Sequence, residues 1–128
     1  MQIDIVFQII ILIFSVVIHE VSHGFMAHFL GDNTAKYKGR LNLNPFNHLE
    51  LFGSFILPVV TYLSGGIVIG WAKPVPFNPY NLRDQKWGEA KVALAGPLSN
   101  LFIALFLAYL YVLELQCSLA QTLFMFPL

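Results

Sequence analysis

Long apolar runs separated by polar stretches dominate the chain, and the first of them predicts a long helix. Apolar residues run from Ile3 to Ile18, and the same helix is expected to continue to about Leu30. At 1.5 Å per residue it is about 40 Å long, more than the ~30 Å hydrocarbon core of a bilayer requires. A second apolar run, Leu51–Ile69, predicts another membrane helix, in which Pro58 is expected to introduce a kink.

A third apolar run begins at Lys91 or Val92 and ends near Leu115. Leu119–Leu128 is apolar again, but such a short segment cannot cross a bilayer and is expected to begin a fourth helix. The predicted fold class is therefore an all-α membrane protein with about three transmembrane helices plus a partial fourth. Residues 1–128 are expected to form a single membrane-embedded domain.

The polar stretch Gly31–Pro45 follows the first helix and permits two interpretations. Thr34–Tyr37 and Leu41–Leu43 form a short β-hairpin-like loop if the chain turns near Gly39. An irregular basic loop at the membrane surface fits the same residues equally well. The basic residues in question are Lys36, Lys38 and Arg40.

A second polar stretch, Trp71–Leu82, contains three prolines and cannot be a regular helix. It is predicted to be extended, either as the lining of a substrate channel or as a connector anchored by aromatic residues at the membrane surface. If Leu51–Ile69 crosses the membrane, the basic residues before and after it lie on opposite sides. The charge pattern then leaves the membrane orientation open.

Composition supports the membrane assignment, because 57% of the residues are hydrophobic and only 11% are charged. A soluble domain has about 25% charged residues. The formal net charge is zero, so nothing indicates a nucleic-acid partner. The N-terminus lacks a basic region and a cleavage site of small residues, so the first helix is expected to be retained. The one cysteine, Cys117, is expected to be a packing residue.

The candidate chemistry lies at the end of the first apolar run, where residues 19–23 read H-E-x-x-H. On a helix, His19 and His23 project from one face, one turn apart. Two imidazoles at that spacing are able to hold one zinc ion, each at roughly 2.0–2.1 Å. Glu20 stands where a general base is able to reach a metal-bound water without being a ligand.

The same five residues also have a simpler interpretation, as hydrogen-bonded core residues that form the pattern by chance. A carboxylate at membrane depth costs roughly 2.5–3.5 kcal/mol on insertion scales, and ionisable groups there usually mark function. Three such groups within five residues favour the metal site. His28 points away from the proposed zinc face and His48 lies near an expected turn, so neither is predicted to be a ligand.

Four stretches together resemble the site-2 protease family of intramembrane zinc metalloproteases, peptidase family M50. They occur in the family's order and cover most of the chain. The resemblance implies zinc held by His19 and His23, Glu20 as the catalytic base, and a site within the membrane, usually nearer the cytosolic side. The matching stretches are His19–Gly24, Gly31–Ala35 leading into Gly39–Pro45, Gly70–Pro76 and Ala95–Asn100.

The resemblance is incomplete in one respect. The family's third zinc ligand is an aspartate in a Leu-Asp-Gly motif on a later membrane segment, and this sequence contains no such motif. Its aspartates, Asp4, Asp32 and Asp84, stand in other contexts. Catalytic zinc sites normally use three protein ligands plus water. The chain is therefore interpreted as the N-terminal part of a protease that is truncated before its third ligand.

The predicted function is that of an intramembrane zinc metalloendopeptidase. It would hydrolyse peptide bonds in transmembrane or membrane-adjacent segments of substrate proteins by Glu20-assisted attack of water bound to one zinc ion. The expected partners are a membrane-protein substrate and the lipid bilayer, with no nucleic acid. The expected location is an integral, multi-pass one, in the inner membrane if the source is prokaryotic.

Two other functions fit parts of the sequence. The missing third ligand favours an inactive membrane scaffold, or pseudoprotease. A metal transporter would need more intramembrane ligands than His19, Glu20 and His23, and the sequence offers few. Substrate identity, oligomeric state and regulation have no signal in the residues.

Overall fold

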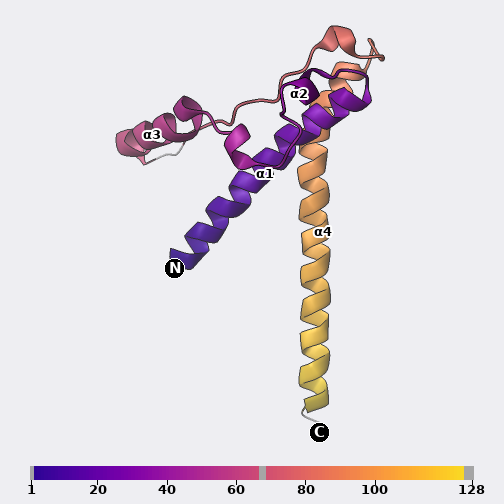
Figure 1. The fold of residues 1–128 in the computed structure, drawn as a ribbon. Coiled ribbons are helices and arrows are strands. Elements are labelled where there is room, and N and C mark those ends of the chain that lie inside the picture. Colours follow the sequence, from indigo (N-terminus) through magenta and orange to yellow (C-terminus); the bar gives the residue numbers. More distant parts are fainter. Residues whose placement is uncertain (1, 67–68, 126–128) are drawn as a thin grey trace.

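The computed structural model describes residues 2–66 and 69–125, and within them every regular element is a helix. Two long helices, α1 (Gln2–Phe29) and α4 (Gly88–Met125), form the frame of the molecule. They run in opposite directions and meet where α1 ends and α4 begins, then diverge toward the chain termini (Figure 1). The predicted all-α fold class is confirmed.

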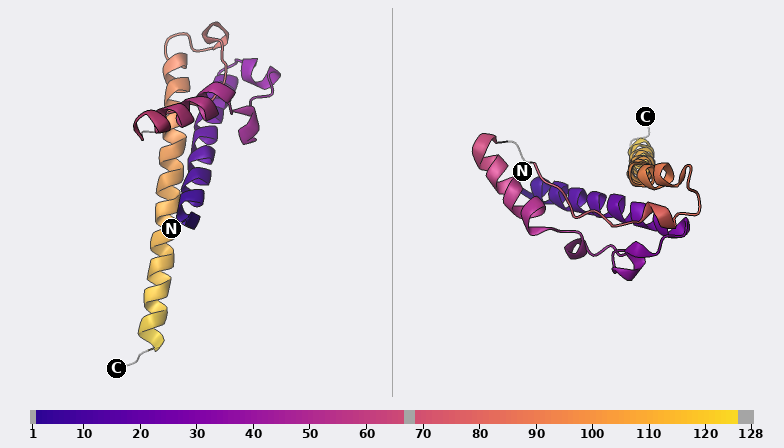
Figure 2. Two further views of the ribbon diagram at one scale, coloured as in Figure 1. Left: turned by 90° about the vertical axis from the view of Figure 1, so that its left-hand side faces the viewer. Right: turned by 90° about the horizontal axis from the view of Figure 1, so that it is seen from above.

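Shorter elements fill the segment between the two long helices. A single turn, α2 (Thr34–Tyr37), follows α1, and two 3-10 turns lie at η1 (Pro45–Asn47) and η3 (Pro79–Asn81). A π-helical turn, η2 (Leu51–Ile56), leads directly into α3 (Leu57–Gly65). Figure 2 shows α3 to one side of α1, with the following chain returning alongside α1 to the start of α4.

Within the described residues, two helices are long and apolar enough to cross a membrane, within Ile9–Phe29 and Gly88–Ser118. Large side chains along α4 are exposed, among them Phe102 at 73% and Leu105 at 62%. An apolar surface of this extent suits contact with lipid rather than water. Few hydrophobic side chains are buried, and one cluster of them gathers Ala27, Leu82 and Val92 where α1 meets α4.

The structure does not confirm Leu51–Ile69 as a third membrane helix. Its described part forms η2 and α3 over Leu51–Gly65. This segment is apolar but shorter than the two candidate spans, and residues 67–68 lie outside the described part. The chain after α3 therefore comes back beside α1. The backbone N–H of Arg83 donates to the carbonyl of Leu30 at 2.8 Å, which joins the two basic stretches at one end of the molecule.

Two further predictions are wrong. Thr34–Tyr37 is the helix α2 rather than a strand, because the Asp32 carboxylate accepts the Thr34 N–H and hydroxyl and starts a helical turn there. Leu41–Leu43 carries no regular element. The expected fourth helix over Leu119–Leu128 is instead a continuation of α4 to Met125, since no turn-forming residue interrupts the helix; residues 126–128 are not described.

Candidate metal centre

The structure brings His19, Glu20 and His23 together on α1, as the sequence predicts. Their nearest donor atoms all lie within 4.8 Å of one another, and each residue is half-buried. The two imidazole rings are 4.7 Å apart between centroids and meet edge to face at 83°. Among residues 2–66 and 69–125, this is the group of three donors able to hold a metal ion.

Gly96 of α4 lies directly over the two imidazoles. A Cβ placed on Gly96 would be 2.7 Å from Nε2 of His19 and nearer still to Nε2 of His23. Both Nε2 atoms therefore face the same small space, which a side chain at this position would fill. A cation held at ~2.0–2.1 Å by both nitrogens needs such a space, so the residues present fit a zinc ion.

The second nitrogen of each imidazole meets a group from α4. His23 Nδ1 lies 2.6 Å from the carbonyl oxygen of Val92. Because a carbonyl oxygen only accepts, Nδ1 carries the hydrogen, and in a neutral imidazole this leaves the lone pair on Nε2. His19 Nδ1 lies 3.4 Å from Nδ2 of Asn100, whose Oδ1 is buried without a hydrogen-bond partner.

Glu20 contacts the segment that links α3 to α4, residues 71–82, which we call the strap. The backbone N–H of Val75 donates to Oε2 of Glu20 at 3.1 Å. Val75 is 6% exposed and packs against Gly24, where an added Cβ would lie 2.6 Å from Val75 Cγ1. The strap therefore approaches α1 closely just beside the H-E-x-x-H turn, as an extended chain of the kind that its prolines predict.

Asp32 holds the other end of the strap. Its buried carboxylate accepts the backbone N–H of Asn78 at 2.6 Å and the side-chain amide of Asn81 at 2.9 Å. Burial raises the pKa of Asp32, but hydrogen bonds from Asn81, Thr34 and Asn78 outweigh it, and the net pKa is below the ordinary 3.8. Asp32 therefore stays ionised in the folded protein at neutral pH.

The other candidate residues lie outside the donor group. His48 is fully buried, with Nε2 2.9 Å from the carbonyl oxygen of Asn42, and His28 is half-buried. Neither joins the group of His19, Glu20 and His23 in the described chain. Cys117 is exposed on α4 rather than packed in the interior.

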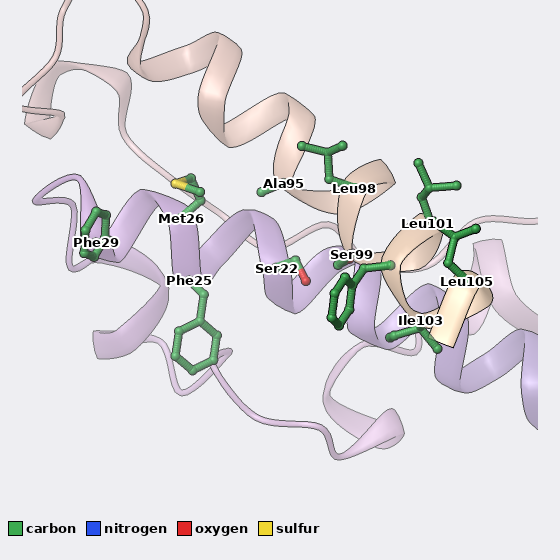
Figure 3. Close-up of a pocket in the computed structure, with 11 residues that line it drawn as sticks. Ser22, Phe25, Met26, Phe29, Ala95, Leu98, Ser99, Leu101, Ile103 and Leu105 are labelled. Carbon is green, nitrogen blue, oxygen red and sulfur yellow. The ribbon is translucent and has the colours of Figure 1, made fainter. Parts of the chain in front are cut away.

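An apolar groove of about 840 Å³ runs between α1 and α4 beside the donor group. Ser22, which precedes His23, and Ser99, three residues after Gly96, both line this groove. Figure 3 shows large apolar side chains from both helices around it. They include Phe25, Met26, Phe29, Leu98, Leu101 and Leu105.

Comparison with known proteins points in the same direction as the geometry. The family model described as "Peptidase family M50" matches residues 7–125. "Putative zinc metalloprotease YwhC" of Bacillus subtilis is 38% identical over 107 residues, which cover 84% of this chain and 46% of that protein. "Putative zinc metalloprotease Rip2" of Mycolicibacterium smegmatis is 34% identical over 97 residues, which cover 73% of this chain and 35% of that protein.

The chain thus spans less than half the length of either relative. No solved structure matches it significantly. The sequence alone had pointed to His19, Glu20 and His23, but not to Gly96 or Val75 as their neighbours. Asn100 carried a weak signal, as a lone polar residue in an apolar run.

Proposed function

The chain belongs to peptidase family M50, and from this premise we propose that it carries the zinc-binding half of an intramembrane metalloendopeptidase. The natural protein would hydrolyse peptide bonds in transmembrane or membrane-adjacent segments of other proteins. The observation that carries the proposal is the convergence of Nε2 of His19 and Nε2 of His23 on the space left open at Gly96. The proposed location is an integral, multi-pass one, in the inner membrane if the source is prokaryotic.

His19 and His23 would hold the zinc ion through Nε2. Bound there, zinc would supply Lewis-acid activation of a water molecule and polarisation of the peptide carbonyl. The Val92 carbonyl fixes the tautomer and ring orientation of His23 from behind. Turning the Asn100 carboxamide over would place its unpartnered Oδ1 beside Nδ1 of His19, which would orient that ring in the same way.

Glu20 would act as the general base. The Val75 N–H engages Oε2, so we assign Oε1 to the proton that the attacking water loses. The same carboxyl group would then return a proton to the leaving amine. Peptide carbonyls in a substrate helix are already hydrogen-bonded, so a substrate must unwind locally before attack. The apolar groove beside Ser22 and Ser99 suits an apolar segment brought to this site.

Two histidines do not complete a catalytic zinc site, which normally has three protein ligands plus water. We propose that the third ligand comes from a part of the natural protein outside residues 1–128. The relatives leave room for this, since 46% or less of their length matches the chain. The same incomplete ligand set supports an inactive membrane scaffold as the second candidate function.

One experiment separates the two functions. The natural full-length protein is reconstituted in lipid, and cleavage of a model transmembrane substrate is compared between wild type and Glu20→Gln. We expect Glu20→Gln to lose activity by about 10²- to 10⁴-fold while it retains zinc, because the amide cannot take the proton. Glu89→Gln, on an exposed carboxylate at the start of α4, is the matched control and should stay active. Undiminished cleavage by Glu20→Gln would remove the protease assignment.

A further inference from the structure

Asp32 has more hydrogen-bonding partners than a helix end requires. Its Oδ1 accepts from the Thr34 N–H at 3.1 Å, the Thr34 hydroxyl at 2.6 Å and the Asn81 amide at 2.9 Å. Its Oδ2 accepts from the Asn78 N–H at 2.6 Å. Two donors come from the start of α2 and two from the strap. The carboxylate therefore ties the end of α1 to a segment more than forty residues away.

The side chain of Asp32 is fully buried, so these bonds decide whether the fold tolerates it. A buried carboxylate is costly unless its oxygens are satisfied, and charge-assisted bonds are about twice as strong as neutral ones. Asp32 does not belong to the donor group of His19, Glu20 and His23. Its role is therefore to hold the strap rather than a metal ion.

The strap transmits this anchoring to Glu20. Asn78, which Asp32 holds, is three residues from Val75, whose N–H donates to Glu20 Oε2. An extended chain spans at most ~3.3–3.6 Å per residue, and Pro76 between them fixes one of the backbone dihedrals. Only Pro76 and Phe77 separate the two residues, so the contacts lie close together along one short segment. Displacement of Asn78 is therefore expected to shift the Val75 N–H relative to the Glu20 carboxylate.

We propose that Asp32 is a positioning residue for the general base, acting through the strap to orient the Glu20 carboxylate. This inference rests on the function proposed above, in which Glu20 takes a proton. If Asp32 is removed, Glu20 keeps its identity but loses its fixed orientation. The chemical step then slows, while substrate binding and zinc content stay as they were.

The test uses the natural full-length protein in lipid and measures kcat, KM and zinc content with the model transmembrane substrate. In Asp32→Asn, an amide N–H₂ group takes the place of one carboxylate oxygen. Because this group is itself a donor, it cannot accept the hydrogen bonds that the oxygen accepted. We expect kcat to fall by about 10- to 100-fold with KM and zinc unchanged, since small misplacements of a catalytic group have effects of that size. Asp84→Asn is the matched control. Asp84 caps the start of α4 through the Trp87 N–H and does not bond the strap residues that Asp32 holds.

A second pair of variants decides the case even if Asp32→Asn fails to fold. Asn81→Ala removes one bond to Oδ1 from the strap side, and Thr34→Val removes one bond to the same oxygen from the α2 side. Positioning through the strap predicts a lower kcat for Asn81→Ala and an unchanged kcat for Thr34→Val. Equal losses in both, a loss of zinc, or full activity in Asn81→Ala would overturn the inference.

The two proposals fail in different ways. If wild type does not cleave, or Glu20→Gln does, the proposed function is wrong. If wild type cleaves and Glu20→Gln does not, but Asp32→Asn and Asn81→Ala keep the wild-type kcat, only the role of Asp32 is wrong.

Discussion

Gly96 sets how closely α4 approaches the two imidazoles of α1. A methyl group there would occupy the space between Nε2 of His19 and Nε2 of His23. We predict that Gly96→Ala weakens zinc binding at least ~10-fold, because the side chain must displace either the ion or α4. Competition with a chelator measures this affinity. Gly65→Ala is the control, since no atom lies within 4 Å of a Cβ at that position. Unchanged zinc affinity in Gly96→Ala would place the ion elsewhere.

Asn100 offers a second test at the scale of single residues. Groups that accept the N–H of a metal-ligating histidine typically change metal affinity by about 10- to 100-fold when they are removed. We predict a loss of that size for Asn100→Leu. Asn100→Asp should bind zinc much as wild type does, because it keeps an oxygen beside Nδ1 of His19. Equal affinity in all three proteins would show that Asn100 has no part in orienting the ring.

These residues also show how far the sequence predicts the site. The spacing of His19 and His23 follows from helical periodicity, so their common face needs no tertiary information. Gly96 and the Val92 carbonyl face the imidazoles only because α4 packs on α1 at that height. Helix register across a contact depends on the whole packed surface, which no local pattern in one helix contains.

At the scale of elements, α2 and the strap show which features follow from the local sequence and which depend on contacts distant in sequence. The prolines of the strap predict an extended chain, and the structure shows no regular element over residues 71–78 but a 3-10 turn, η3, at Pro79–Asn81. Thr34–Tyr37 suits a strand by composition, yet it forms a helical turn because Asp32 accepts the Thr34 N–H and hydroxyl. Asp32 is buried and held in place by Asn78 and Asn81, which are distant in sequence. The turn itself follows from local bonds between residues two apart, which the strand prediction overlooked; only the burial of Asp32 depends on the distant contacts.

The anchoring of the strap predicts a pH dependence of stability. The pKa of Asp32 is lower in the folded protein than its ordinary 3.8, so its ionised form stabilises the fold. This stabilisation is complete above the ordinary pKa and is lost as the pH falls through the folded pKa. We predict that wild type melts several degrees above Asp32→Asn at about pH 6 and that the gap narrows as the pH falls below 3.8.

The measurement is thermal unfolding in detergent across this pH range. Asp84→Asn serves as the control. Hydrogen bonds from Lys91 and Trp87 lower the pKa of Asp84, but its side chain is partly exposed, so water screens the interaction. Its gap from wild type at about pH 6 should be smaller than that of Asp32→Asn. A gap between wild type and Asp32→Asn that is constant with pH would show that the ionised carboxylate does not stabilise the fold.

For the whole molecule, the structure changes how the charge pattern is interpreted. All seven lysines and arginines lie between Lys36 and Lys91. They would fall on both sides of the membrane if Leu51–Ile69 crossed it, but α3 is short and the strap returns to the end of α1 (Figure 1). The sequence could not settle this, because the path of a short apolar helix depends on its packing. With both basic stretches at one end, the positive-inside rule favours that end as cytoplasmic.

Cysteine labelling in sealed vesicles tests this arrangement. Cys117 is exposed near the far end of α4, about 44 Å along the helix from Gly88. We predict that an impermeant thiol reagent reaches Cys117 from one side of the membrane only. In a Cys117→Ser background, Lys38→Cys and Lys86→Cys should both label from the opposite, cytoplasmic side. Labelling of Lys38→Cys and Lys86→Cys from different sides would mean that the segment between them crosses the membrane.

The most direct test of the account is the zinc content of the purified natural protein, measured for wild type, His23→Ala and Glu20→Gln. If two imidazoles on α1 hold one ion, wild type and Glu20→Gln should each contain about one zinc per protein. His23→Ala should contain less than about a tenth of that amount. Wild type without zinc, or His23→Ala with its full complement, would contradict the assignment of the metal centre.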